Sequence, residues 1–283
     1  MKKSIALILA LALSLSVVSA LAETALTPIR IAASANPHEI LLNFVKEDLA
    51  QDGYDLQITW VDGYVLQNPA TSADEYDANF FQHRPYLNAY NATAGASEQL
   101  AAVIPVHYEP FGIYAGTKTD LNDLEDGDAI AVPNDPSNET RALLLLQEAG
   151  VIALPEDANV DSGLTKLDVI VKDKKIEIIE VDAERLPATL ADVAFAVING
   201  NYAIPAGLYP TRDAIYLESS EGEAAQLYTN YVVVKVGNED APFVEALRKA
   251  LHSDKVKQFL LENDDFKGGV VPNFEGEAAA DPQ

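Results

Sequence analysis

The residues best suited to chemistry in this chain lie in the segment AVPNDPSNETRALLLL, at positions 131–146. Its apolar start predicts a buried strand, its Asn, Asp, Pro and Ser residues predict a turn, and the remainder predicts a helix with Arg141 in the opening turn. A helix N-terminus offers unpaired N–H donors and a partial positive charge. Together with a guanidinium, these groups could bind a small carboxylate or another anion. The alternative is that the polar residues only cap the helix and that Arg141 is a solvated surface charge.

A second segment, DANFFQHRPYLNAYN at 77–91, is rich in rings. The rings in this segment and shortly upstream of it are Trp60, Tyr64, Phe80, Phe81, His83, Tyr86 and Tyr90. An aromatic wall suits an apolar ligand side chain, and a thioether gains roughly 0.3–1.5 kcal/mol from contacts between its sulfur and a ring. Taken alone, packing in the core of a lobe explains these rings better.

Asparagines interrupt two apolar segments. Asn199 and Asn201 follow a strand-like run in AVINGNYA (196–203), and Asn230 lies inside LYTNYVVV (227–234). An amide in such a place is costly to bury unless it is hydrogen-bonded. Its partner could be the ammonium or carboxylate of a ligand, or it could be the protein backbone.

Short apolar runs alternate with helical patterns along most of the chain. Strands are predicted at 29–34, 56–61, 129–133, 168–171, 175–181, 193–199 and 228–237, and helices at 38–51, 120–124, 186–192, 242–262 and from the Arg141 turn to Gly150. This alternation predicts an α/β protein with central sheets. One large sheet or two lobes would fit, and Pro110 and Gly112 inside the run at 108–116 favour a segment that crosses between lobes. Since ligands bind at strand ends and in interlobe clefts, the polar clusters predict a cleft that binds a small molecule.

These segments together resemble the NlpA/MetQ family, the substrate-binding lipoproteins that serve as methionine-type receptors of ABC importers. The resemblance is carried by VDGYVLQNPA, DANFFQHRPYL, YEPFGIYAGTK, AVPNDPSNETRALLLL, AVINGNYA and LYTN, and it extends over about 29–274. PNDPSN followed by Arg, and FQHRPYL, are the most specific of these blocks. The resemblance implies a two-lobed periplasmic-binding-protein fold with two crossovers and the ligand in the interlobe cleft. Its expected parts are a signal peptide at 1–22, a first lobe at 28–110 plus 206–274, a second lobe at 111–205 and a disordered tail at 275–283.

The resemblance also implies roles for single residues. Arg141 would hold the ligand carboxylate in a bidentate contact, and Asn199 and Asn230 would fix the ammonium and carboxylate groups. The side-chain pocket would be lined by Tyr64, Phe81, His83 and Tyr86. L-methionine is the expected ligand, with D-methionine, another apolar amino acid or a methionine dipeptide as alternatives. The expected partner is an ABC transporter permease in the membrane, and such receptors usually act as monomers.

The ends and composition of the chain lead to an expected location. Lys2 and Lys3, an apolar run at 5–18 and the small residues before position 23 predict a secretory signal cleaved after about Ala22. The sequence contains no cysteine, whereas most family members carry a lipobox cysteine. We therefore expect an exported protein at the periplasm or cell-envelope exterior, without a lipid anchor. The formal net charge of −25 disfavours binding to nucleic acid.

Two other classes of function are weakly supported. Among His38, His83, His107 and His252, no tight cluster has ligand-like spacing apart from His107 beside Glu109, so no metal site is predicted. A divalent-metal receptor is the remaining alternative. The sequence has no GxSxG, HExxH or glycine-rich phosphate loop. We therefore predict no enzyme, no catalytic residue and no cofactor.

Overall fold

The computed structural model describes residues 25–219, 223–266 and 268–275. The predicted signal segment at 1–22 and residues 276–283 of the predicted tail lie outside the described residues. Within the described ranges, no helix combines the length and the apolar composition that crossing a bilayer requires.

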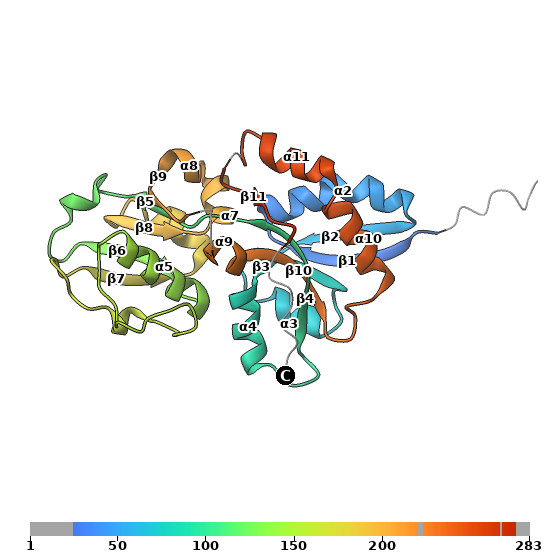
Figure 1. Ribbon diagram of the computed structural model, residues 1–283, viewed down its shortest axis with the longest axis horizontal. Coiled ribbons are helices and arrows are strands. Elements are labelled where there is room, and N and C mark those ends of the chain that lie inside the picture. The colour runs from blue at the N-terminus through green and yellow to red at the C-terminus, as the bar shows by residue number, and fades with distance from the viewer. Residues whose placement is uncertain (1–24, 220–222, 267, 276–283) are drawn as a thin grey trace, which may run out of the picture.

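Two sheets form the centres of two lobes (Figure 1). The six-stranded sheet of the first lobe has the order β11-β4-β10-β3-β1-β2, and the five-stranded sheet of the second lobe has the order β7-β6-β8-β5-β9. The strands of the first sheet are β1 (Thr27–Ala33), β2 (Tyr54–Trp60), β3 (Ala78–His83), β4 (Leu100–Tyr108), β10 (Thr229–Lys235) and β11 (Val271–Pro272). Those of the second are β5 (Gly112–Ala115), β6 (Ala129–Pro133), β7 (Glu177–Val181), β8 (Phe195–Ile198) and β9 (Ala214–Leu217).

Helices cover these sheets and connect their strands. The longer ones are α2 (Ile40–Gln51), α3 (Gln67–Ser72), α4 (Arg84–Thr93), α5 (Pro136–Glu148), α9 (Glu223–Leu227), α10 (Pro242–Leu251) and α11 (Asp254–Glu262). The short turns are η1 (Ala35–Glu39), η2 (Leu121–Asp123), η3 (Lys166–Asp168), η4 (Ala183–Arg185), α6 (Leu186–Thr189), α7 (Gly200–Ala203), η5 (Ile204–Ala206) and α8 (Pro210–Asp213).

Both faces of the sheet in the first lobe are buried. Since successive side chains of a strand point to opposite faces, each strand contributes to two different cores. Val232 and Val234 of β10 pack into a core shared with α2, α10 and α11. Tyr231 and Val233 point the other way and pack with Leu87 of α4. The buried centre of β10, YVVV, is therefore a continuous apolar run in the sequence.

The second lobe is built in the same way around β6. Ile130 and Val132 pack against α5, whereas Ala131 packs on the opposite face with Leu186 of α6. The helix α5 begins at Pro136, earlier than the sequence predicts, with Asp135 as its N-cap. Arg141 therefore lies in the second turn of α5 and not in its opening turn. Tyr64 and Phe81 of the first lobe pack into the same cluster as Ala131, so the two lobes are in direct apolar contact.

The chain passes between the two sheets twice, after β4 and again between β9 and β10. The first crossing contains Pro110, as the sequence predicts, and the expected fold class with two lobes and two crossovers is confirmed. The expected lobe boundary at 206 differs from the observed sheets, because β9 pairs with β5 of the second sheet. The second crossing therefore lies after Leu217.

Two predicted elements are wrong in detail. The segment 168–171 is not a strand of the sheet: Ile170 makes one isolated bridge with Ala153, and its apolar neighbours Leu167 and Val171 are exposed. The predicted helix at 242–262 is two helices, since the backbone at Ser253 is extended. The break allows both α10 and α11 to place an apolar face on the first lobe.

Candidate ligand-binding site

A narrow cavity between the lobes is lined by side chains from both of them. The space between the lining atoms is about 340 Å³ with the open mouth included. Its lining residues are Tyr64, Phe81, Gln82, His83, Tyr86, Glu109, Asn138, Arg141, Asn199, Gly200, Asn201 and Asn230. The residues predicted from the sequence, Tyr64, Phe81, His83, Tyr86, Arg141, Asn199 and Asn230, are all among them. Their roles toward a ligand stay predictions.

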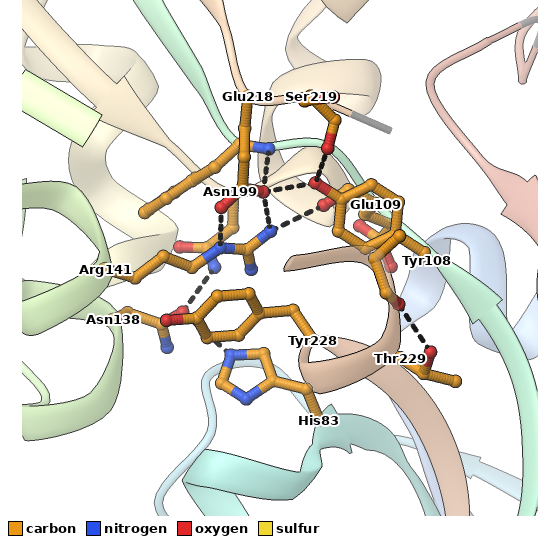
Figure 2. A network of polar contacts seen from close by, with 12 residues as sticks. His83, Tyr108, Glu109, Asn138, Arg141, Asn199, Glu218, Ser219, Tyr228 and Thr229 are labelled. Carbon is orange, nitrogen blue, oxygen red and sulfur yellow. Dashed lines mark hydrogen bonds and ion pairs between the residues drawn. The ribbon is translucent and has the colours of Figure 1, made fainter. Parts of the chain in front are cut away.

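Arg141 projects from α5 into the cavity wall and is buried in an ion pair with Glu218, which follows β9 (Figure 2). Its Nε lies 3.0 Å from Oε1 of Glu218, and its Nη2 lies 2.5 Å from Oε2. Nη2 also donates to the backbone carbonyl of Glu109 at 2.9 Å. The ring of Tyr228 lies 4.0 Å from the guanidinium carbon. Burial lowers the pKa of Arg141, but the negative charge of Glu218 raises it by more, so the pKa lies above its ordinary value.

This ion pair changes the predicted role of Arg141. The expected bidentate contact with a ligand carboxylate cannot use the Nε and Nη2 edge, because Glu218 occupies it. Nη1 makes no hydrogen bond with any residue in the described ranges, and it is the nitrogen left for a ligand. Sequence reasoning missed Glu218, although an acidic residue directly after the apolar run AIYL was a signal for it.

Asp135, the N-cap of α5, fixes the orientation of a chain of polar side chains that begins one turn before Arg141 on the same helix. Its carboxylate accepts from Nδ2 of Asn138 at 2.8 and 3.0 Å, so Oδ1 of Asn138 must act as the acceptor. That oxygen accepts from Nδ2 of Asn199 at 2.9 Å and contacts Nε2 of His83 at 3.1 Å. His83 therefore carries its proton on Nε2, while its Nδ1 accepts from the backbone N–H of Tyr86 at 3.3 Å. Burial lowers the pKa of His83 to about 3, so the ring is neutral.

Two amide atoms at the cavity are buried without a protein partner among the described residues. One is the carbonyl oxygen of Asn199, whose nitrogen is engaged with Asn138. The other is the amide nitrogen of Asn201, whose oxygen accepts from the hydroxyl of Tyr64 at 2.7 Å. Buried polar atoms are almost always hydrogen-bonded, so an acceptor and a donor left open at one cavity point to a polar ligand.

The rings of the aromatic wall pack on one another as well as facing the cavity. The ring centroids of Tyr64 and Phe81 are 5.8 Å apart, and that of Tyr86 lies 5.6 Å from Tyr64 and 5.5 Å from Phe81. The sequence left core packing and a ligand wall as alternative roles for these rings. The same side chains do both: they pack in the core and line the cavity. Such rings offer a thioether or another apolar chain a surface with little rotamer freedom to lose.

Behind the cavity, His38 of η1 and His107 of β4 meet Glu109, an arrangement that sequence reasoning missed. Nε2 of His107 lies 2.9 Å from Oε1 of Glu109, and Nε2 of His38 lies 3.8 Å from the same oxygen. His38 also contacts Oδ1 of Asn230 at 3.1 Å. The expectation that the sequence holds no tight histidine cluster is wrong, since the candidate donor atoms of these three residues lie within 4.8 Å of one another. Imidazole and carboxylate are donors that zinc accepts, and here the three side chains are engaged with one another and with Asn230.

Burial perturbs all three groups. It lowers the pKa of His38 to about 4 and that of His107 to about 3. It raises the pKa of Glu109 to about 7. Both imidazoles are therefore neutral at physiological pH, and the carboxyl group titrates close to it.

Comparison with known proteins adds a family to this geometry. The family model described as NlpA lipoprotein matches residues 29–274. The D-methionine-binding lipoprotein MetQ of Escherichia coli (strain K12) is 38% identical over 234 residues, which are 81% of this chain and 83% of that protein. The membrane lipoprotein TpN32 of Treponema pallidum (strain Nichols) is 38% identical over 239 residues, covering 84% of this chain and 85% of that protein.

These names correct the expected location. Both relatives are named lipoproteins, and the expectation of a family member exported without a lipid anchor is wrong. That expectation rested on the absence of cysteine from the sequence and on the first 22 residues, which lie outside the described part of the chain. The relatives are consistently described as lipoproteins, and the absence of cysteine does not outweigh that description.

The solved structures agree with the sequence comparison. A nutrient-binding protein from Burkholderia cenocepacia, solved with methionine bound, superposes with a TM-score of 0.80 and 39% sequence identity. The match covers 87% of this chain and 100% of that one. With the family model matching nearly all of the two lobes, this chain belongs to the NlpA lipoprotein family.

Proposed function

We propose that this protein is the substrate-binding receptor of an ABC transporter and that it binds methionine, or a closely related amino acid, between its lobes. The observation that carries this proposal is the pair of unpartnered amide atoms on Asn199 and Asn201, which open onto the same cavity as Arg141 and the aromatic wall. The names of the relatives, which record methionine binding, support the choice of ligand.

The cavity offers a separate place for each part of an amino acid. Nη1 of Arg141 and Nδ2 of Asn201 are donors for the ligand carboxylate, while Oδ1 of Asn199 is an acceptor for its ammonium group. Asn230 completes this polar end. The apolar side chain would lie against Tyr64, Phe81, His83 and Tyr86.

The energies suit a receptor for a small zwitterion. A hydrogen bond to a charged group contributes about 1.5–3 kcal/mol, and burial of one apolar side chain contributes about 1.5–3 kcal/mol. Several such contributions, less the entropy of association and of ordering the site, give micromolar affinity or tighter.

Closure of the lobes would couple binding to delivery. Two hydrogen bonds already join the lobes across the cavity, one from His83 to Asn138 and one from Tyr64 to Asn201. A ligand that contacts both walls favours this closed form over an open one by its differential affinity. The closed form would then present both lobes together to the transporter permease.

We also infer that the protein binds its ligand without transforming it and acts as a monomer without nucleic acid. The relatives named above are binding proteins. The net charge of −25 supports the last point, since it repels polyphosphates.

Calorimetric titration tests this function. The protein, unfolded and refolded to remove any co-purified ligand, is titrated with L-methionine, D-methionine, other apolar amino acids and a methionine dipeptide. We expect one-to-one binding of methionine and at least tenfold weaker binding in Asn199→Ala. Asn122→Ala, an exposed change in the second lobe, is the matched control. No binding of any of these compounds to the folded protein would refute the proposal.

A further inference from the structure

Glu109 is a buried carboxylate at the cavity that has no permanent cation of its own. It lies at the first crossing between the lobes, and only 6% of its surface is exposed. Among the described residues, its ion-pair contacts are with His38 and His107, whose low pKa values leave both imidazoles neutral. Arg141 contacts the backbone carbonyl of Glu109, and its charge is already balanced by Glu218.

The carboxylate of Glu109 is nevertheless held in place. Its Oε1 contacts Nε2 of His107 at 2.9 Å, and the backbone N–H of Asn201 stabilises the charged form of the carboxylate. Gly200 makes room for it, because a Cβ at that position would lie 2.7 Å from Oε2 of Glu109. A buried anion that is fixed in this way, beside a cavity and without a cation, is suited to a cationic group of a ligand.

The neighbouring oxygens fit the same cation. An ammonium group has three donors. The carbonyl oxygen of Asn199 is an open acceptor. Oδ1 of Asn230 accepts from Nε2 of the neutral His38, which orients that amide and leaves the oxygen a second lone pair. With Glu109, these groups supply three acceptors, one of them charged, at one cavity.

We propose that Glu109 is the anionic partner of the ligand's ammonium group, with Asn199 and Asn230 as its neutral acceptors, and that this carboxylate makes the receptor select α-amino compounds. The inference rests on the proposed function, since it names the recognition of one group of the same ligand. His38 and His107 are positioning residues, because they orient Asn230 and Glu109 and are set behind the cavity.

The role of Glu109 predicts that binding is linked to a proton. Without ligand, burial keeps its pKa at about 7, and an adjacent ammonium would lower it. Binding below pH 7 must therefore release a proton, and affinity falls by up to tenfold per pH unit as the pH drops from 7. The other groups that face Glu109 are His38, His107, Arg141, Tyr64 and Tyr114, and their pKa values lie well outside this range.

The first test compares two ligands in two proteins. L-methionine and its analogue without the amino group, 4-(methylthio)butanoate, are titrated into the wild type and into Glu109→Gln. We expect the variant to bind methionine at least tenfold more weakly and the analogue no more weakly than the wild type does. Glu184→Gln, which removes a carboxylate from a separate hollow on the other side of Tyr64 and Tyr86, is the matched control and should leave the ratio unchanged. Equal loss for both ligands, or unchanged methionine affinity in Glu109→Gln, would overturn the inference.

The second test needs no variant and so does not depend on the folding of Glu109→Gln. Titration of methionine into the wild type at pH 6, in two buffers of different ionisation enthalpy, measures the protons exchanged on binding. Release of close to one proton per ligand is expected, and no release refutes the inference. Metal analysis of the same protein adds an independent check, since a stoichiometric ion held by His38, His107 and Glu109 would also overturn it. Failure of the wild type to bind methionine at all would instead refute the proposed function.

Discussion

Arg141 and Glu218, 77 residues apart in the sequence, form a buried ion pair in which Nε and Nη2 face the two carboxylate oxygens at 3.0 and 2.5 Å. The hydroxyl of Tyr108 and the backbone N–H of Phe111 also donate to Glu218. The carboxylate is thus fully engaged, and it fixes the guanidinium with only Nη1 left for the cavity. Arg141 is therefore a structural residue of the second lobe as well as a candidate ligand contact.

We expect Arg141→Ala to destabilise the protein as well as to remove binding. Loss of one partner leaves a buried charge uncompensated, which costs about 3–5 kcal/mol. Urea denaturation measures this free energy of unfolding. The double variant Arg141→Met with Glu218→Gln keeps an acceptor for Tyr108 and should recover most of the stability without recovering binding. If the double variant were as unstable as Arg141→Ala, the uncompensated charge would not be the cause.

We expect Asp135→Ala to weaken ligand binding although Asp135 does not line the cavity. The substitution removes the N-cap of α5, which costs about 0.5–2 kcal/mol. It also removes the acceptor that orients Asn138, so Asn199 and His83 lose their fixed partner. Titration with methionine should show at least a tenfold loss of affinity. Asp120→Ala removes the cap of η2 without touching the cavity and serves as the control; if both variants bound equally well, the orienting role would be refuted.

We expect Gly200→Ala to lower affinity through Glu109. The added Cβ would lie 2.7 Å from Oε2 of Glu109, closer than real contacts allow, and 3.0 Å from its Cβ, which is a tight contact. Overpacking of this kind costs about 1–3 kcal/mol and would displace the carboxylate. Thermal unfolding and methionine titration check the two effects. Gly95→Ala meets only the flexible side chain of Glu98 and should change neither. Wild-type affinity in Gly200→Ala would show that the position of Glu109 is not critical.

We expect Tyr64→Phe to shift the lobes toward an open arrangement. The hydroxyl of Tyr64 donates to Asn201 across the cleft, and loss of such a bond costs about 0.5–1.5 kcal/mol. The ring stays in the aromatic wall, so the apolar contact with a ligand is kept. Small-angle scattering of the ligand-free protein should show a larger radius of gyration. Tyr90→Phe loses a hydroxyl contact with Ser72 inside the first lobe and is the control. An unchanged radius in Tyr64→Phe would refute the prediction.

We expect stability to fall as the pH drops from about 6.5 to 5. His38, His83 and His107 have folded-state pKa values of about 4, 3 and 3, against about 6.5 in the unfolded chain. Their contribution is present above pH 6.5 and is lost as the pH falls, because the unfolded state binds more protons. Glu109 and Glu139 act in the opposite sense, since burial raises the pKa of each carboxyl to about 7 and so favours the folded state at low pH. The net uptake is up to about one proton, or up to about 1.4 kcal/mol per pH unit. Urea titrations between pH 5 and 7.5 measure it, and a flat profile would contradict buried neutral histidines.

Several parts of the fold and the site could be predicted because their signals are local. The apolar run AIAVP forms β6, and the helix predicted after it forms α5, although the turn residues Pro136, Ser137 and Asn138 already belong to that helix. The blocks that contain Tyr64, Arg141, Asn199 and Asn230 all contribute side chains to one cavity, as the resemblance to the family implied. Periodicity and capping act over a few residues and can therefore be read in the sequence.

Other features depended on the tertiary structure. The pairs of Arg141 with Glu218 and of His38 with Asn230 join residues 77 and 192 positions apart. The strand β9 also belongs to the second sheet because it pairs with β5, and no local sequence pattern encodes which strands pair. The sequence by itself determined most of the elements and the polar side chains in or beside them. Only the packing of the two sheets decided which buried charges meet, because the energy of a buried charge depends on neighbours that the two crossings bring together.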